Sequence, residues 1–442
     1  MKNTNTESLI RSYNKWKGHD ILERLVLVSL FFMPILSLSI RHWLSGWFSF
    51  LSLLAVISLS RNLRNPLGRE EKALLWVFSA FLFSFILSAT LNDWTSSSIR
   101  RIGTEFKYLL FIPLYILIRR YTDSEKYFFS GVIAGGLVLG LQALYEVLVL
   151  GNTRGVGIYG AIVFGDLSIL FAFFGILFLA YKRPSGKIRI FCLLSIALAL
   201  TATYLSGDRN GWLAGIILGL MAPFLLPSRI NLKKLVTTYA FLSVLLALLF
   251  FVIDNPISKR AELAIDQTTH YFENMGAPDF KDYNLRGDSA GFRLEQWRVG
   301  LIAFRDAPWI GYGPGNAART ENEYVKRGIG HPHLYNPKAY TNIGGLHSTY
   351  FETLVNQGIL GVLALFFFLG YPLYVFYRNR HRSPFISTSG IILILSYMIF
   401  GLTENPFVHD NFSSFYLTAL AVLFTAAVRQ TQKNDSHNMP TA

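Results

Sequence analysis

The segment His347–Gly361, HSTYFETLVNQGILG, marks the point where a long polar stretch of the chain runs back into an apolar one. A histidine and a serine come first, nine residues separate them from Gly358, and the chain beyond Gly361 is apolar again through Phe366–Phe368. An ionisable side chain at the edge of a membrane segment is costly unless it has a function. The stretch therefore raises two questions: whether the chain crosses a membrane, and what His347 does there.

The composition indicates a membrane protein. Of the 442 residues, 52% are hydrophobic and only 15% are charged, and the mean hydropathy is +0.37. Soluble domains carry about 25% charged residues, so this balance points to a bilayer. Apolar runs close to the roughly 20 residues that span a bilayer recur along the whole chain. We therefore predict an all-α polytopic membrane protein with about 12 transmembrane helices and one large helical loop.

The apolar runs divide the chain into three parts. Residues 1–253 are predicted to form an N-terminal bundle of about nine helices, residues 254–348 the loop domain, and residues 349–442 about three further helices and a cytoplasmic tail. The runs fall at residues 25–40, 43–60, 73–91, 106–118, 128–150, 161–180, 188–206, 212–226, 235–253, 349–377, 385–402 and 413–428.

Basic residues predict the orientation of the chain in the membrane. They gather in alternate loops, which the positive-inside rule assigns to the cytoplasm. This set holds Lys15, Lys17, Arg24, Arg61, Arg64, Arg69, Lys72, Arg119, Arg120, Lys126, Lys182, Arg183, Lys187, Arg229, Lys233, Lys234, Arg378, Arg380, Arg382, Arg429 and Lys433. The opposite short loops hold only Arg41, Arg100, Arg101, Arg154 and Arg209. Both termini are therefore predicted to be cytoplasmic, and the loop at 254–348 to face outward. Because the net charge of +14 lies in such loops, it does not indicate nucleic-acid binding.

The N-terminus and the single cysteine are predicted to be structural. The N-terminal segment is polar and basic and lacks an evident small-residue cleavage site, which predicts a retained cytoplasmic tail rather than a signal peptide. Cys192 lies in an apolar run, so it is predicted to be a small core residue, and no intrachain disulfide can form.

The outward loop is predicted to be helical. One helix follows Pro256, and a second begins near Ser289 and ends before Pro308. On the second helix, Arg293, Trp297 and Leu301 share one face at four-residue spacing. The glycine-rich segment WIGYGPGN follows, where the backbone can approach other groups closely.

Four cations on the outward side break the charge rule. They are Lys107, Arg154, Arg209 and Arg293. If they converge, they form a cationic pocket that suits a phosphate or diphosphate, because Arg offers a bidentate fork and Lys a point charge. The alternative is that each one reaches lipid headgroups or pairs with a nearby acidic residue, for example Arg209 with Asp208.

His347 is the candidate general base, because histidine titrates near neutral pH and can take a proton from a hydroxyl. The alternative is a histidine that is hydrogen-bonded at a helix start. His331 and His333 raise the question of a metal site with His347, but no acidic or cysteine ligand accompanies them at a recognised spacing, and we predict no metal.

Several other functions lack their motifs in this sequence. No phosphate-binding loop of an ATPase occurs, and no Asp-x-Asp pair of the kind that holds a metal on a nucleotide sugar. Glu146 and Asp166 are acidic residues in apolar runs, which a proton-coupled transporter could use and which structural hydrogen bonds explain as readily.

With these residues in view, the chain resembles the bacterial O-antigen ligases, within the wider membrane family of polysaccharide polymerases and protein O-oligosaccharyltransferases. Arg209 and Leu213, four positions later, match the Arg–Leu motif of the ligases after a mid-chain span. His347 and Ser348, followed by nine residues and then Gly358 and Gly361, match the second motif at every fixed position. Arg293 and Lys107 resemble family elements in the loop and at the start of the fourth span.

The polymerases are the relatives most easily confused with the ligases. Their loops carry an arginine, ten residues and then a glycine. Starting from Arg286, Arg293 or Arg305, the position of that glycine is held by Trp297, Phe304 or Asn316. The sequence therefore favours a ligase.

The resemblance implies a glycosyltransferase of lipopolysaccharide biosynthesis in the bacterial inner membrane, with its active site facing the periplasm. It would transfer polysaccharide from undecaprenyl diphosphate to lipid A–core without ATP, metal or other cofactor. His347 would be the general base, and Arg209, Arg293, Lys107 and Arg154 would bind the diphosphate. The partners would be these two lipid-linked substrates and membrane lipids, not nucleic acid. The alternatives are a polymerase or a protein O-oligosaccharyltransferase of the same family and, from another class, a transporter or flippase.

Overall fold

The computed structural model describes residues 20–59, 66–225, 256–277, 280–282, 284–285, 289–340 and 345–437. In these ranges every regular element is helical. The N-terminal helices are α2 (Ile21–Ile35), α3 (Trp43–Ile57), α5 (Arg69–Leu91), α6 (Ser96–Glu105), α7 (Lys107–Ile118), α8 (Ser124–Leu144) with the π-helical turn η1 (Tyr145–Val149), α9 (Ala161–Lys182), α10 (Gly186–Ser206) and α11 (Arg209–Leu225).

The remaining helices form the loop region and the C-terminal part of the bundle. The loop region holds α13 (Pro256–Asn274), α14 (Ser289–Asp306), α15 (Ala317–Lys326) and the short 3-10 helices η2 (Phe280–Asp282), η4 (Pro332–Leu334) and η5 (Pro337–Tyr340). The C-terminal helices are α16 (Thr349–Asn379), α17 (Pro384–Thr403) and α18 (Asp410–His437). The bounds of α14 agree with the helix that Ser289 and Pro308 predict.

Seven helices in the described ranges are long and apolar enough to cross a membrane. Their spans are Arg69–Leu91, Ser124–Val149, Ala161–Lys182, Gly186–Ser206, Thr349–Asn379, Pro384–Thr403 and Asp410–Thr431. Four other predicted spans correspond to the shorter helices α2, α3, α7 and α11. The predicted span at 235–253 lies outside the described residues. The total of about 12 spans therefore stays a prediction, as do the domain limits at residues 253 and 348.

Three helices form the centre of the bundle. The apolar stretch of α18 is buried along its whole length, and α17 and α9 are buried along most of theirs. Large side chains are exposed on peripheral helices such as α10 and α16, where a lipid environment would suit them. Helix α8 lies close to two neighbours, because a Cβ atom on Gly135 would come 2.6 Å from the carbonyl oxygen of Pro34 in α2, and one on Gly136 2.5 Å from the hydroxyl of Ser195 in α10.

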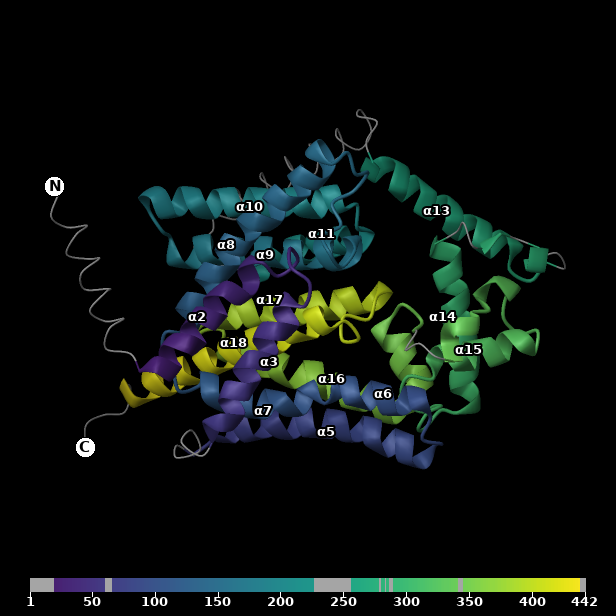
Figure 1. The fold of residues 1–442 in the computed structure, drawn as a ribbon, viewed down its shortest axis with the longest axis horizontal. Coiled ribbons are helices and arrows are strands. Elements are labelled where there is room, and N and C mark those ends of the chain that lie inside the picture. Colours follow the sequence, from purple (N-terminus) through teal and green to yellow (C-terminus); the bar gives the residue numbers. More distant parts are fainter. Residues whose placement is uncertain are drawn as a thin grey trace.

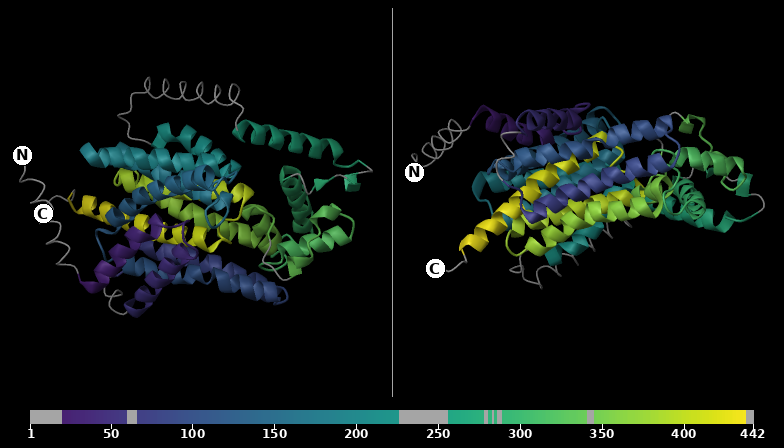
Figure 2. Two further views of the ribbon diagram at one scale, coloured as in Figure 1. Left: turned by 45° about the horizontal axis from the view of Figure 1, so that its top comes forward. Right: turned by 90° about the horizontal axis from the view of Figure 1, so that it is seen from below.

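The loop helices gather at one end of the bundle. Figures 1 and 2 show α13, α14 and α15 together at the end opposite to the last turns of α18. Helix α14 packs on α13, on α15 and on α16. A small apolar cluster of its own, centred on Val299, Ala303, Tyr324, Leu334 and Val355, holds α14 and α15 to α16. The loop region is thus fixed to the bundle at the N-terminal end of α16, where His347 lies.

Candidate active site

His347 lies in the short connection between the loop region and α16. Its backbone adopts the left-handed conformation, with φ of 48°, which is uncommon outside glycine and more frequent for histidine than for most residues. The indole nitrogen of Trp297 in α14 donates a hydrogen bond of 2.9 Å to the carbonyl of Leu346, directly before it. Trp297 also stacks on Phe351 of α16, with 5.0 Å between ring centroids. Trp297 therefore fixes the backbone from which His347 projects.

The side chain of His347 contacts a carboxylate. Its Nδ1 lies 3.5 Å from Oε2 of Glu404, and Nε2 of His409 lies 3.5 Å from Oε1 of the same residue. Burial raises the pKa of Glu404, but hydrogen bonds to His347, to His409 and to the backbone of Asn405 outweigh it, so that this pKa lies below its usual range. An ionised carboxylate between two imidazoles orients both rings and stabilises either ring when it takes up a proton.

These groups open into a pocket of about 350 Å³. Its lining comes from α14, α15, the segment before α16, α16 itself and the connection between α17 and α18. The lining residues are Phe292, Gln296, Ala318, Glu321, Leu334, Asn336, Gly345, His347, Glu352, Glu404, Asn405, Val408 and His409. The side chain of His347 is 48% exposed, so a ligand in the pocket can reach it.

Ser348 holds the start of α16 to the end of α17. Its side chain is buried, and its hydroxyl donates a hydrogen bond of 3.2 Å to the carbonyl of Gly401. The next residue, Thr349, donates from its backbone to the carbonyl of Glu404 at 3.2 Å. These contacts fix the distance between His347 and Glu404, which are far apart in the sequence.

Gly358 produces a break in α16 into which the glycine-rich segment after α14 fits. Its φ of 60° and ψ of −151° are not helical, and a Cβ there would lie 2.5 Å from the carbonyl oxygen of Pro308. Around this break, the amide of Ile359 donates to Pro308 at 2.8 Å and the amide of Tyr312 to Val355 at 2.9 Å. The Gly358 position of the motif therefore joins the loop helices to α16. Gly361 is similarly crowded, since a Cβ there would clash with the side chain of Gln357.

Arg209 lies at the same end of α17 as His347. It is the first residue of α11, and the side-chain Nδ2 of its neighbour Asn210 donates to the carbonyl of Phe400 at 3.2 Å. Ser348, the neighbour of His347, binds the carbonyl of Gly401, which follows Phe400 in α17. Asn210 and Ser348 therefore bind adjacent residues of one helix. Leu213, the second residue of the motif, lies one turn further along α11 and is 37% exposed.

Arg293 lies beside the pocket on α14. It is half-buried, and it is flanked by two lining residues, Phe292 next to it and Gln296 one turn later. Arg293 itself is not among the lining residues.

Lys107 is close to the site, but its ammonium group has partners in the protein. Its Nζ lies 3.3 Å from the carboxylate of Asp410 and donates to the carbonyl of Phe407, also at 3.3 Å. Asp410 follows His409 directly, so Lys107 holds the segment that carries the second histidine.

The side chain of Arg154 makes hydrogen bonds to the backbone at the junction of α10 and α11. Its Nε donates to the carbonyl of Ser206 at 2.7 Å, and one terminal nitrogen donates to that of Gly207 at 3.3 Å. These carbonyls lie at the C-terminal end of α10, where a cation is favourable. The contact fixes the turn that leads into Arg209, and Arg154 is not among the residues that line the pocket around His347.

The remaining candidates make structural contacts. Both ring nitrogens of His331 are engaged, one with the carbonyl of Phe280 at 2.9 Å and one with the amide of His333 at 3.1 Å. No cluster of three metal-binding side chains occurs in the described ranges. Glu146 accepts hydrogen bonds from the backbone after η1, and Asp166 accepts one from Asn210.

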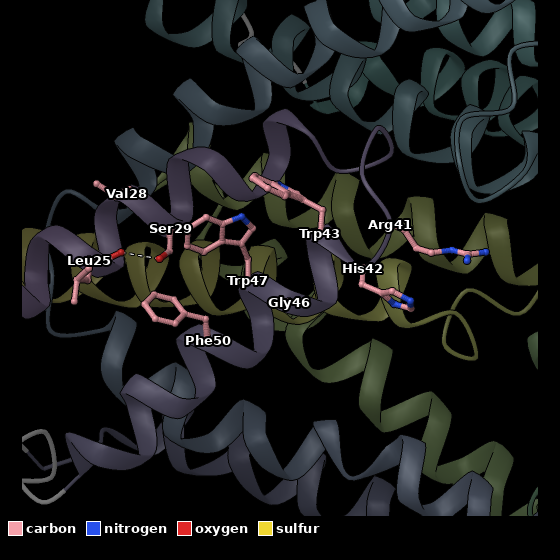
Figure 3. A pocket seen from close by; sticks show the side chains of 9 residues that line it. All are labelled: Leu25, Val28, Ser29, Arg41, His42, Trp43, Gly46, Trp47 and Phe50. Atoms are coloured by element: carbon pink, nitrogen blue, oxygen red, sulfur yellow. Dashed lines mark hydrogen bonds between the residues drawn. The ribbon is translucent and has the colours of Figure 1, made fainter.

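A second pocket, of about 460 Å³, lies between α2 and α3 and contains none of the predicted site residues. Figure 3 shows Arg41 and His42 at one end of its lining and Leu25 at the other, with Trp47 and Phe50 between them. The hydroxyl of Ser29 in its wall is used within α2, donating to the carbonyl of Leu25 at 2.7 Å.

Comparison with known proteins finds a family model and a relative that are similar to this chain. Residues 194–367 match the family model described as O-Antigen ligase. This part of the chain is therefore similar to the O-antigen ligase family. A protein of Haemophilus influenzae (strain Rd), described only as uncharacterized, is 28% identical over 403 residues, covering 89% of this chain and 96% of the relative. Family members are glycosyltransferase-like ligases and polymerases that act on lipid-linked polysaccharides.

The part that matches the O-antigen ligase family includes Arg209, Arg293 and His347, and also the break at Gly358. Glu404 and His409 lie outside it and were not predicted from the sequence. The buried ion pair of Arg101 with Glu105, at 2.7 Å, also lies outside the matched part and was not predicted. The guanidinium of Arg101 lies 3.7 Å from the carboxylate of Glu352 in the pocket wall. Glu404 directly follows an apolar run, which is the one signal that could have suggested it.

Proposed function

We propose that this protein is an O-antigen ligase of the bacterial inner membrane, which transfers polysaccharide from undecaprenyl diphosphate to a sugar hydroxyl of lipid A–core on the periplasmic face. The observation that carries the proposal is the contact of His347 with Glu404 in a pocket at the edge of the apolar bundle, within a chain that is similar to the O-antigen ligase family.

In the proposed reaction, His347 takes the proton from the acceptor hydroxyl as its oxygen attacks the anomeric carbon of the donor. The bond from that carbon to the diphosphate oxygen breaks, and undecaprenyl diphosphate leaves with the electron pair. Direct displacement inverts the anomeric carbon. Glu404 stabilises the imidazolium that forms, which supports a larger contribution from His347 than an isolated histidine would make.

Arg209 and Arg293 are the proposed diphosphate ligands. The support for Arg209 is its position beside Asn210, which binds the same end of α17 as Ser348. The support for Arg293 is its place one residue from the pocket lining. We assign Lys107 and Arg154 to the same cationic region, where their contacts favour a role in positioning His409 and Arg209. The donor is already activated, so the reaction needs neither ATP nor metal.

Replacing His347 or Arg209 tests the roles proposed for these residues. In cells, His347→Ala should abolish the attachment of O-antigen to lipid A–core while the protein still inserts in the membrane. His270→Ala, at an exposed histidine of α13, is the matched control and should leave the lipopolysaccharide ladder unchanged. Arg209→Lys keeps the charge but loses the bidentate fork, and it should lower ligation about tenfold or more. A normal ladder in His347→Ala cells would rule out the base.

The polymerase alternative predicts a different ladder. A polymerase uses a lipid-linked acceptor, so its loss shortens the polysaccharide to one repeat unit that is still ligated to lipid A–core. A strain that lacks this protein and shows single repeat units on lipid A–core would identify a polymerase, whereas one that shows bare lipid A–core supports the ligase.

A further inference from the structure

The pocket that contains His347 also holds two buried polar side chains that the proposed reaction does not use. Gln296 of α14 is 4% exposed and Glu321 of α15 is 5% exposed, and both line the pocket. Nε2 of Gln296 donates a hydrogen bond of 3.2 Å to Oε2 of Glu321. Two oxygens, Oε1 of Gln296 and Oε1 of Glu321, are buried and have no hydrogen-bond partner among the described residues.

Two such oxygens at a pocket wall indicate a ligand. Buried polar atoms are almost always hydrogen-bonded, because leaving one without a partner forfeits its interaction with water. Gln296 Oε1 can only accept a hydrogen bond, whereas a protonated Glu321 can donate one. The pair therefore suits a ligand whose neighbouring groups both donate and accept, as the hydroxyls of a sugar ring do.

The surroundings of Glu321 favour its protonated form at neutral pH. Burial raises its pKa to about 8, even though the hydrogen bond from Gln296 lowers it, and the carboxylate of Glu295 on α14 raises it further. The other titratable side chains that line this pocket are His347, Glu352, Glu404 and His409.

The charge of the pocket selects against phosphate. Its lining residues include three glutamates, and in the part of the chain that the structure describes they include no Lys or Arg. An anionic group would meet the ionised carboxylate of Glu404 and find no cation among the lining residues. The apolar side chains of Phe292 and Leu334 suit the C–H faces of a sugar ring. The pocket thus fits an uncharged sugar better than the diphosphate of the donor.

We propose that Gln296 and Glu321 form an acceptor subsite, which binds neighbouring hydroxyls of an uncharged, unphosphorylated sugar and so presents a further hydroxyl to His347. This proposal rests on the proposed ligase function, and under it the pocket binds the acceptor. The donor diphosphate then lies outside the pocket, on the side of Arg209 and Arg293.

The test measures binding and turnover separately on the full-length protein in nanodiscs. The binding probe is lipid A–core purified from a strain without O-antigen, added with no donor. Glu321→Ala should raise the Kd for lipid A–core and the acceptor KM about tenfold and leave the donor KM unchanged, because one hydrogen bond to the acceptor is lost. Glu323→Gln, at a partly exposed glutamate of the same helix that does not line the pocket, is the matched control and should change neither constant.

The pH dependence of lipid A–core binding distinguishes a Glu321 that contacts the acceptor from one that only stabilises the fold. Wild-type protein should bind lipid A–core more weakly at pH 9 than at pH 7, because Glu321 ionises and loses its donor. Glu321→Gln retains an N–H donor at both values of pH, so its affinity should match the wild type at pH 7 and exceed it at pH 9. Equal affinities of the wild type and both Glu321 variants at both pH values would refute the subsite alone. Failure of wild-type protein to bind lipid A–core would refute the ligase function, and the subsite with it.

Discussion

The contact between His347 and Glu404 makes a quantitative prediction for Glu404→Gln, which keeps the shape of the side chain and removes its charge. At the observed separation of 3.5 Å, and with an effective dielectric constant of about 20, attraction between the carboxylate and an imidazolium is roughly 5 kcal/mol. Water reaches the half-exposed His347 and screens this attraction, which leaves about 2 kcal/mol. The variant should therefore lower kcat about thirty-fold.

The assay is ligation by purified protein at saturating concentrations of both lipid substrates. Glu404→Gln should reduce kcat without a matching change in the acceptor KM, since the charge acts mainly when His347 becomes protonated. His347→Ala should reduce kcat further, by about 10²–10⁴-fold, because it removes the base itself. Thermal unfolding of each variant checks that it is folded. A folded Glu404→Gln protein with wild-type kcat would refute the proposed role of this carboxylate.

Three further predictions concern the break in α16, the charge of Glu404 and the orientation of the loop region. Gly358→Ala should lower the melting temperature, because its backbone conformation is essentially restricted to glycine and costs another residue about 1–3 kcal/mol, and because the new methyl group clashes. Gly370→Ala, whose Cβ meets nothing nearer than 4.0 Å, is the control. Equal melting temperatures of the two variants would contradict the explanation of the break. The pKa of Glu404 in the folded protein lies below its usual range. The ionised carboxylate therefore stabilises the fold at pH values above its unfolded-state pKa, and this stabilisation is lost as the pH falls through the folded-state pKa. Acid should lower the free energy of unfolding of the wild type more than that of Glu404→Gln, and equal losses in the two proteins would contradict this. If the loop region faces the periplasm, the double variant Glu273→Cys/Cys192→Ser should react with a membrane-impermeant maleimide added to cells whose outer membrane has been permeabilised. Labelling only after the inner membrane is lysed would place the loop in the cytoplasm.

Periodicity and motif spacing predicted much of the fold, because they report local properties. The apolar runs identified the long helices, and Ser289 and Pro308 marked both ends of α14. Hydropathy did not distinguish a spanning helix from a short one. The runs at 106–118 and 212–226 became α7 and α11, whose lengths of 12 and 17 residues fall below a full span.

The site was predictable only where a single segment carries it. His347 and Gly358 belong to one motif, whereas Glu404 reaches His347 through tertiary contacts that start at Ser348. Nothing in the spacing of the sequence encodes that contact. The same limit applies to Arg154, whose hydrogen bonds to carbonyls at the end of α10 depend on tertiary contacts that the sequence does not show.

The most direct test of the central claim is reconstitution. Purified protein in nanodiscs is supplied with undecaprenyl-diphosphate-linked polysaccharide and lipid A–core, in the presence of a chelator and without ATP. The proposed ligase reaction predicts polysaccharide-capped lipid A–core and free undecaprenyl diphosphate with the wild type, and about 10²-fold less or still smaller amounts of both with a correctly folded His347→Ala protein. Equal product formation by the two proteins, or elongation of the donor with no transfer to lipid A–core, would contradict it.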